Sequence, residues 1–417
     1  MLFVVIGLCL LYIVLQLLAG EKIYRPSVMF AILWGTILLA HSFGGYQLPQ
    51  VGNETYLIIA CGLMAFFIGT SLARISKFKI TIGSYKLFSK RINQGAFNVL
   101  RVVFFALMFM PVVRAIGLLI EGASLYTIRY SLQNDILGTG TIAILFNYYC
   151  EPFLTFMIVY SVANFFSANR DIRNMISTII GVITMVIISG GRFFLLYFSG
   201  ALIISFLLYK KTISKNRTVR GKKVLKRVRQ LIAIAIVAIL LVSIIRGSKV
   251  WQTVYVYLCG GVPFFEHLKD TLVGEHTYGA ATLYGFLRPI FVILRKVGIC
   301  DFPMWLQNTE EIFLAVDNPY YIAPGILFNS FTTGFFAPYL DAGIAGVCIV
   351  YFILGCISER IYKRVKLENE YSVSWFLLIS LVVVFSFFRL TVTHYSFALA
   401  FVYLMLTHRM VLKDSAE

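Results

Sequence analysis

Long apolar runs, separated by short polar stretches, follow one another along most of the 417-residue chain. Most of these runs approach the length of about 20 residues that a helix needs to cross the hydrocarbon core of a bilayer. Because lipid offers no hydrogen bonds to the backbone, only helices and closed barrels span membranes. The runs are too long and too continuously apolar for barrel strands. The pattern therefore predicts an all-α fold, a polytopic membrane helical bundle.

Eleven spans are predicted, and the apolar start of the chain, without a charged leader region, is interpreted as a retained first span. The predicted spans are Leu2 to Leu18, Val28 to Phe43, Tyr56 to Leu72, Phe97 to Leu119, Thr141 to Phe166, Met175 to Ser189, Phe193 to Tyr209, Leu231 to Ile245, Ile344 to Ile357, Val373 to Phe388 and Tyr395 to Thr407. Two further apolar stretches, Ala281 to Val297 and Ala323 to Tyr339, contain prolines and glycines that suggest broken or interfacial helices. If both of these cross the membrane, the bundle has thirteen helices, and the sidedness is unchanged.

Basic residues gather in loops that alternate to one side of the predicted membrane. The densest run, Lys210 to Arg229, holds ten of the 37 lysines and arginines in a chain of formal net charge +18. A basic arm for RNA or DNA is the alternative interpretation, but an orientation signal facing anionic lipid is the ordinary one. We therefore expect no nucleic-acid partner, an outside N-terminus and an inside C-terminus.

The longest polar segment divides the chain into three predicted parts: helices one to eight (1–245), a large extracytoplasmic loop with interfacial or re-entrant helices (246–342), and C-terminal helices with a cytoplasmic tail (343–417). The loop carries 8 of the 19 acidic residues. It also carries the aromatic pairs Phe264-Phe265, Tyr320-Tyr321 and Phe335-Phe336. This is the segment in which a site for a large substrate is expected.

Arginines break the positive-inside pattern at the outer ends of several predicted spans. They are Arg114, Arg192, Arg246 and Arg389, and Arg288 lies within an apolar helix-like run of the loop. Guanidinium groups grip phosphate oxygens in bidentate fashion, so arginines at one membrane depth suggest a polyanion site. The alternative for each one is a membrane anchor whose charge reaches the interface.

Three side chains are considered as general bases: Glu266, Asp341 and His394. Most other acids of the loop are expected to be solvated surface. Glu151, inside the fifth predicted span, is expected to be either paired with an arginine or protonated beside the neighbouring tyrosines.

Metal and cofactor signals are missing from the sequence. It contains no D-x-D, no H-E-x-x-H, no C-x-x-C and no phosphate-binding glycine loop followed by Lys-Ser/Thr. We therefore predict no metal and no cofactor. Among the seven scattered cysteines, Cys259 and Cys300 share the long loop and could form a disulfide.

Two motifs resemble those of bacterial oligosaccharide repeat-unit polymerases, the Wzy-type O-antigen or capsule polymerases. One is the outward hairpin Ile188-Ser-Gly-Gly-Arg192, followed by an apolar span. The other is the run from Asn329 to Gly343, which is similar to the family's N-x-[FY]-T…[YF]-x-D-x-G segment. The layout of many spans with one large late loop extends the resemblance over nearly the whole chain.

The resemblance implies a glycosyltransferase of the GT-C type at the outer face of the bacterial cytoplasmic (inner) membrane. It would polymerise oligosaccharide repeat units carried on undecaprenyl diphosphate into O-antigen or capsular polysaccharide. A chain-length regulator and a flippase are the implied protein partners. Four arginines, with Arg114 as a possible fifth, would hold diphosphate groups and stabilise the departing lipid diphosphate: Arg192, Arg246, Arg288 and Arg389. Glu266, Asp341 or His394 would activate the acceptor, and the paired aromatics of the loop would stack on sugar faces.

Three alternatives stay open. An O-antigen ligase or another lipid-linked sugar transferase could use the same scaffold. A polysaccharide flippase or secondary transporter would use Glu151 as its coupling acid, although the sequence contains no internal repeat. The third is a non-catalytic assembly partner.

Overall fold

A computed structural model describes residues 1–75, 88–124, 127–128, 130–132, 140–167, 171–189, 191–215, 230, 233–234, 237, 250–272, 274 and 276–412. Seven helical segments among these residues are long and apolar enough to cross a membrane. They are α3 (Asn53–Ile75), α4 (Gln94–Ile120), the continuous run of α6 (Gly140–Leu145), η3 (Phe146–Cys150) and α7 (Glu151–Phe166), α8 (Ile172–Ser189), α9 (Phe193–Lys215), α15 (Phe336–Arg364), and α16 (Glu370–Val384) with η4 (Phe385–Phe387). The protein is thus an all-α polytopic membrane protein.

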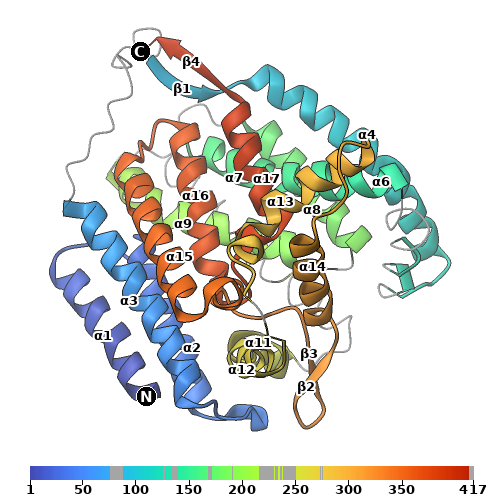
Figure 1. Cartoon of the computed structure of the whole chain (residues 1–417). Coiled ribbons are helices and arrows are strands. Elements are labelled where there is room, and N and C mark those ends of the chain that lie inside the picture. Colours follow the sequence, from blue (N-terminus) through green and yellow to red (C-terminus); the bar gives the residue numbers. More distant parts are fainter. Residues whose placement is uncertain are drawn as a thin grey trace. The chain divides into compact units, whose positions relative to one another are not determined.

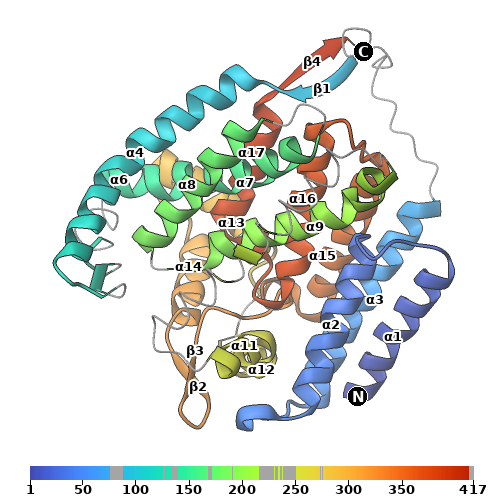
Figure 2. The ribbon, with the colours of Figure 1, turned by 180° about the vertical axis from the view of Figure 1, so that it is seen from behind.

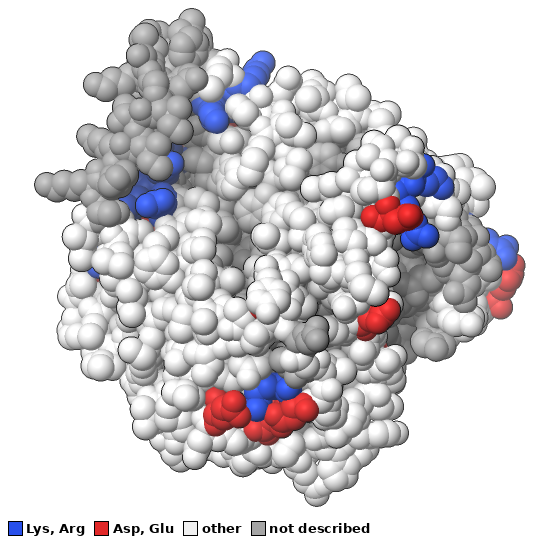
Figure 3. Space-filling view, in the orientation of Figure 1, with Lys and Arg blue, Asp and Glu red and all other residues white. Residues whose placement is uncertain are grey.

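Three shorter apolar helices complete the set: α1 (Leu2–Leu18), α2 (Pro26–Ser42) and α17 (Tyr395–Leu406). Together with the seven longer segments they fall on ten of the eleven predicted spans. The remaining prediction, 231–245, lies mostly outside the described residues. Charged side chains are sparse on the face drawn in Figure 3, as helices in lipid require.

Contacts divide the chain into two compact units. The first contains 1–77, 248–363 and 382–395, and the second contains 78–247, 364–381 and 396–417. Segments far apart in the sequence share each core. The three-part division along the sequence stays a prediction about membrane topology, whereas these units are defined by packing.

In the first unit, α1, α2 and α3 lie side by side (Figures 1 and 2). Aromatic rings join them to α15: Phe30 lies 4.4 Å from Phe66 and 5.6 Å from Tyr351 between ring centroids. Glycine permits close approach of α3 to α15, because a Cβ on Gly355 would lie 2.4 Å from the carbonyl oxygen of Phe66.

A buried ion pair closes one end of this helix group. Arg25, only 2% exposed, donates from Nη2 to Glu359 Oε1 at 2.8 Å and from Nε to Oε2 at 3.1 Å. The same guanidinium contacts Glu21 at 2.8 Å. Removing one member of a buried pair costs about 3–5 kcal/mol, so this contact fixes α15 against the start of α2.

The polar segment of the first unit is also largely helical. It contains α11 (Val250–Cys259), α12 (Gly261–Leu272), α13 (Ala280–Lys296) and α14 (Met304–Val316), followed by β2 (Tyr320–Ala323) and β3 (Ile326–Phe328). The stretch Ala281 to Val297 is helical as expected up to Lys296, where α13 ends, and Val297 is the C-cap.

The prediction of a broken helix over the second stretch, 323–339, is wrong up to residue 335. Strands β2 and β3 pair in antiparallel fashion around Pro324 and Gly325, whose φ of 71° is favourable only for glycine. Residues 329–335 are not helical, and α15 begins at Phe336. The aromatic and β-branched residues in β2 and β3 favour strand, and the Pro-Gly turn prevents a continuous helix.

The second unit contains α4, α6, α7, α8, α9, α17 and the part of α16 up to Leu381. Asn93 caps α4, because its Oδ1 accepts from the amides of Gly95 and Ala96 at 3.1 and 3.3 Å. Strand β1 (Phe88–Ile92), just before this cap, pairs with β4 (His408–Leu412), just after α17. No sequence pattern predicted this ribbon.

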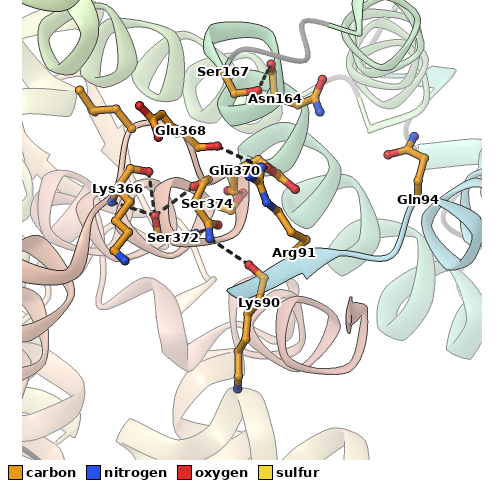
Figure 4. Close-up of polar contacts among 12 residues, drawn as sticks. Lys90, Arg91, Gln94, Asn164, Ser167, Lys366, Glu368, Glu370, Ser372 and Ser374 are labelled. Carbon is orange, nitrogen blue, oxygen red and sulfur yellow. Dashed lines mark hydrogen bonds and ion pairs between the residues drawn. The ribbon is translucent and has the colours of Figure 1, made fainter. Parts of the chain in front are cut away.

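An ion pair fixes the ribbon to the start of α16 (Figure 4). Arg91 Nη1 donates to Glu370 Oε2 at 2.7 Å and to the carbonyl of Glu368 at 3.0 Å. Asn369 Nδ2 donates to the carbonyl of Lys90 at 3.0 Å. The ends of three helices of the second unit, α4, α16 and α17, therefore meet at one polar cluster.

Candidate functional site

A charged cavity of about 680 Å³ lies between α13 and α14 in the first unit. Its volume falls within the range of about 300–1,000 Å³ that is usual for ligand sites. Its polar lining residues are Arg288, Arg295, Asp301, Gln307, Glu310 and Glu311. The site is therefore built from the segment in which the sequence predicted function.

Helix α13 presents its cationic side chains to this cavity. Arg288 and Arg295 are seven residues apart, which is two helical turns, so they lie on the same face of the helix. Arg288 donates to Glu310 Oε1 from Nε at 3.1 Å and from Nη2 at 2.7 Å. The side chains of Arg288 and Glu310 are about a quarter exposed, at 27% and 25%. A pair this exposed contributes at most about 1 kcal/mol, so the contact is easily exchanged for another anion.

Arg295 is a cavity residue that the sequence reasoning missed. Its guanidinium carbon lies 6.0 Å from the centroid of the Phe302 ring, in a cation–π contact. The helical spacing from Arg288 was the signal that could have identified it. The cavity thus holds two guanidinium groups on one wall.

His394 lies beside the same helix, directly after η5 (Thr391–Thr393). Helix α13 approaches this segment closely at Gly285, where a Cβ would meet the carbonyl oxygen of Val392 at 2.4 Å and that of His394 at 2.9 Å. Only glycine permits this contact. Arg288 follows Gly285 by less than one turn and is brought near the histidine.

The pKa of His394 is lowered to about 3, mainly by burial and then by the positive charges of Arg389 and Arg288. The imidazole is therefore neutral at physiological pH. This electrostatic coupling joins three predicted site residues that lie far apart in the sequence. Arg288, Arg389 and His394 form what we call the cation–histidine cluster.

Arg389 also ties the Asn329 to Gly343 motif to the end of α16. Its Nη2 donates to the carbonyl of Ser330 at 3.0 Å, and Thr333 forms a parallel β-bridge with it. Ser330 and Thr333 both have a φ of 64°. A β-branched residue at positive φ is strained, and such strain concentrates at functional sites.

Asp341 is buried, whereas a general base would have to be exposed to the substrate. It is only 4% exposed, and its carboxylate accepts from Thr277 Oγ1 at 2.6 Å and from the amides of Ala281 and Thr282 at 2.9 Å. The carboxylate thereby caps the N-terminus of α13 and interacts favourably with its dipole. A catalytic role for Asp341 stays a prediction, whereas the contacts directly show a role in positioning α13.

Glu266 caps a different helix. Its Oε1 accepts from the amide of Gly52 at 2.6 Å and from Thr55 Oγ1 at 3.2 Å, at the start of α3. Its role as a base stays a prediction as well.

The remaining predicted arginines do not belong to the described part of the first unit. Arg114 is exposed on α4, and Arg192 immediately precedes α9; both are in the second unit. Arg246 lies outside the described residues. Convergence of all five arginines on one pocket stays a prediction.

The aromatic pairs differ in exposure. Tyr320 and Tyr321 are 43% and 62% exposed, and the Tyr320 ring stacks on His267 at 3.6 Å between centroids. The Phe264-Phe265 and Phe335-Phe336 pairs are at most 1% exposed. The prediction that these two pairs contact sugars is wrong, because their rings fill the core; the tyrosines alone are accessible.

The cysteine prediction is also corrected. Cys259 is buried, Cys300 is exposed, and both are free thiols, so they form no disulfide. Among the described residues, no group of three or more His, Cys, Asp or Glu could hold a metal ion.

Comparison with known proteins does not place the chain. No family model matches it, and no curated protein and no solved structure matches it either.

Proposed function

We propose that this protein is a membrane-embedded glycosyltransferase that polymerises undecaprenyl-diphosphate-linked oligosaccharide repeat units into O-antigen or capsular polysaccharide. The observation that carries the proposal is the cation–histidine cluster beside an arginine-lined cavity: Arg288 both lines the cavity and lowers the pKa of His394. The sequence resemblance to repeat-unit polymerases supports the same assignment. The site would face the outside of the bacterial cytoplasmic membrane.

The arginines would hold the diphosphate of the lipid-linked donor. Arg288 and Arg295 on one helix face, with Arg389 nearby through His394, supply guanidinium groups suited to phosphate oxygens. During transfer, the bond between the anomeric carbon of the growing chain and the diphosphate oxygen breaks. Fixed positive charges stabilise the oxygen that takes the electron pair.

His394 would accept the proton of the attacking hydroxyl. A pKa of about 3 makes the imidazole a weak base in the empty site, and a base is most effective when its pKa is near the working pH. Burial is the largest cause of the low pKa of His394, and the charges of Arg389 and Arg288 come second. A bound diphosphate would offset these two charges and so raise the pKa of His394 by the smaller part of the shift.

The surroundings of the cavity fit a lipid-linked substrate. Val292 of α13 and Leu314 of α14 add apolar side chains to the lining of the cavity, beside its arginines. Apolar lining beside bound phosphate is suited to the first carbons of a prenyl chain. The exposed Tyr320 and Tyr321 are suited to stack on sugar rings.

The test is the surface-polysaccharide ladder of a deletion strain complemented with variants. We expect R288Q and H394Q to give single repeat units and no polymer, whereas R360Q, at an exposed arginine of α15, gives the wild-type ladder. Wild-type chain lengths in R288Q would contradict the proposal. Accumulation of long lipid-linked polymer in the deletion strain would instead identify the protein as a ligase.

A further inference from the structure

A polar cluster lies between α4, α7 and α8 in the second unit. Arg101 on α4 is its cation. Its Nη1 donates to Asn174 Oδ1 at 2.9 Å and to Ser177 Oγ at 3.4 Å, and its guanidinium carbon lies 5.8 Å from the Phe97 ring centroid. All three partners are neutral.

No carboxylate in the described part of the chain neutralises Arg101. The ion pairs found there involve Arg25, Arg74, Arg91, Lys269 and Arg288. An unneutralised charge within a membrane helix is costly. The environment of Arg101 therefore favours the binding of an anion from outside the protein.

The cluster also has hydrogen-bond donors left over. Asn174 is fully buried, and its Oδ1 accepts from Arg101 and, at 3.5 Å, from Gln94. Its Nδ2 finds no acceptor among the described residues. A guanidinium carries five N–H donors, and the contacts above use one of its nitrogens. Excess donors around a positive charge are what phosphate oxygens require.

Apolar side chains flank the cluster on the outer surfaces of both helices. Val102 on α4 is 66% exposed, and Ile176 and Ile180 on α8 are 51% and 49% exposed. Arg101 lies seven residues into α4, about 10 Å from its first residue. A ligand here would place an anionic group at the depth of lipid headgroups and apolar chains along the helices.

We propose that the surface formed by α4 and α8 around Arg101 binds the phosphate of an anionic glycerophospholipid through the half-buried Arg101 guanidinium, which the buried Asn174 holds in position. Arg173, exposed at the start of α8, has no side-chain contact among those described for the cluster and provides a matched control for charge alone. The basic loops predict that this end of α4 faces the cytoplasm. The bound lipid then belongs to the inner leaflet, and the site is separate from the proposed transferase site.

Native mass spectrometry of the purified full-length protein tests this site. The probes are phosphatidylglycerol, phosphatidylcholine and inorganic phosphate. We expect wild type and R173Q to retain a phosphatidylglycerol molecule, and R101Q to bind it about tenfold more weakly, because hydrogen bonds to a charged group are lost. Neither phosphatidylcholine nor inorganic phosphate should displace it.

Thermal denaturation separates lipid binding from misfolding. Phosphatidylglycerol should raise the melting temperature of wild type and R173Q, whereas R101Q should melt cooperatively without this increase; R101K should respond in part. Equal losses of phosphatidylglycerol binding in R101Q and R173Q would mean that general charge attraction holds the lipid, and would overturn the proposal. Unchanged binding in R101Q, or displacement by inorganic phosphate, would also overturn it.

Discussion

The carboxylate of Asp341 accepts a hydrogen bond from the amide of Thr282 at 2.9 Å and so ties the start of α15 to the start of α13. Helix α13 carries both cavity arginines, Arg288 and Arg295. The geometry of the site therefore depends on Asp341, a side chain that lies about half of the polar segment away from the two arginines in the sequence.

Substituting D341A should destabilise the protein by about 2 kcal/mol, because a cap is lost and buried amides lose their acceptor. The change is measured as a lower melting temperature in detergent, with D270A, at a side chain 59% exposed, as the control. D341N keeps one carbonyl acceptor and should fall between D341A and wild type. Unchanged stability in D341A, together with loss of polymerisation, would instead favour a catalytic role.

The substitution G285A should displace α13 from η5. Its Cβ would meet the carbonyl oxygens of Val392 and His394 at 2.4 and 2.9 Å, which are backbone atoms that cannot turn aside. We expect a loss of about 1–3 kcal/mol, as is usual for overpacking, and loss of polymer. G117A on α4, where no atom lies within 4 Å, should be neutral or slightly stabilising. A fully active and stable G285A would contradict the close packing.

The low pKa of His394 predicts a pH dependence of stability. The folded-state pKa of about 3 lies below the ordinary value of 6.5, so the unfolded state takes up the proton first as the pH falls. The stabilising contribution is present above pH 6.5 and is lost progressively as the pH falls toward 3. Melting temperatures between pH 4 and 8 should therefore fall less steeply in H394Q than in wild type. The exposed His276 provides the control H276Q, which should follow wild type; equal slopes in H394Q and wild type would contradict the account.

The Arg288–Glu310 contact predicts competition between Glu310 and the substrate for the guanidinium. E310Q should bind inorganic pyrophosphate about two- to fivefold more tightly, because a partly exposed ion pair contributes about 1 kcal/mol or less. Calorimetric titration measures this, with E311Q, at a second acid of the same cavity, as the control. A weaker affinity in E310Q, or an equal gain in E311Q, would exclude specific competition.

The spans were predictable from the sequence because burial in lipid imposes a simple requirement on each segment. Ten segments of apolar residues became ten helical segments. The β2–β3 hairpin was missed because the apolar content of 323–339 outweighed the turn signal of Pro324 and Gly325. The spacing of the apolar residues and the Pro-Gly turn, more than the overall hydrophobicity, determined the structure of that segment.

The site was predictable only in part. Arg288, Arg389 and His394 were identified one by one, from charges at unusual places in an apolar chain, and the structure brings them together. The caps formed by Asp341 and Glu266 were not predictable, because their partners lie about 60 and more than 200 residues away in the sequence. Such contacts are set by tertiary packing and leave no local pattern.

The most direct test of the central claim is polymerisation by the purified protein of lipid-linked repeat units isolated from the deletion strain. Wild type should lengthen the glycan, whereas R288Q, R389Q and H394Q should be slower by about a hundredfold, the usual cost of losing one group that stabilises the transition state. R360Q should match wild type. Wild-type rates in all three cluster variants, or no polymer from wild-type protein supplied with intact lipid-linked units, would contradict the account.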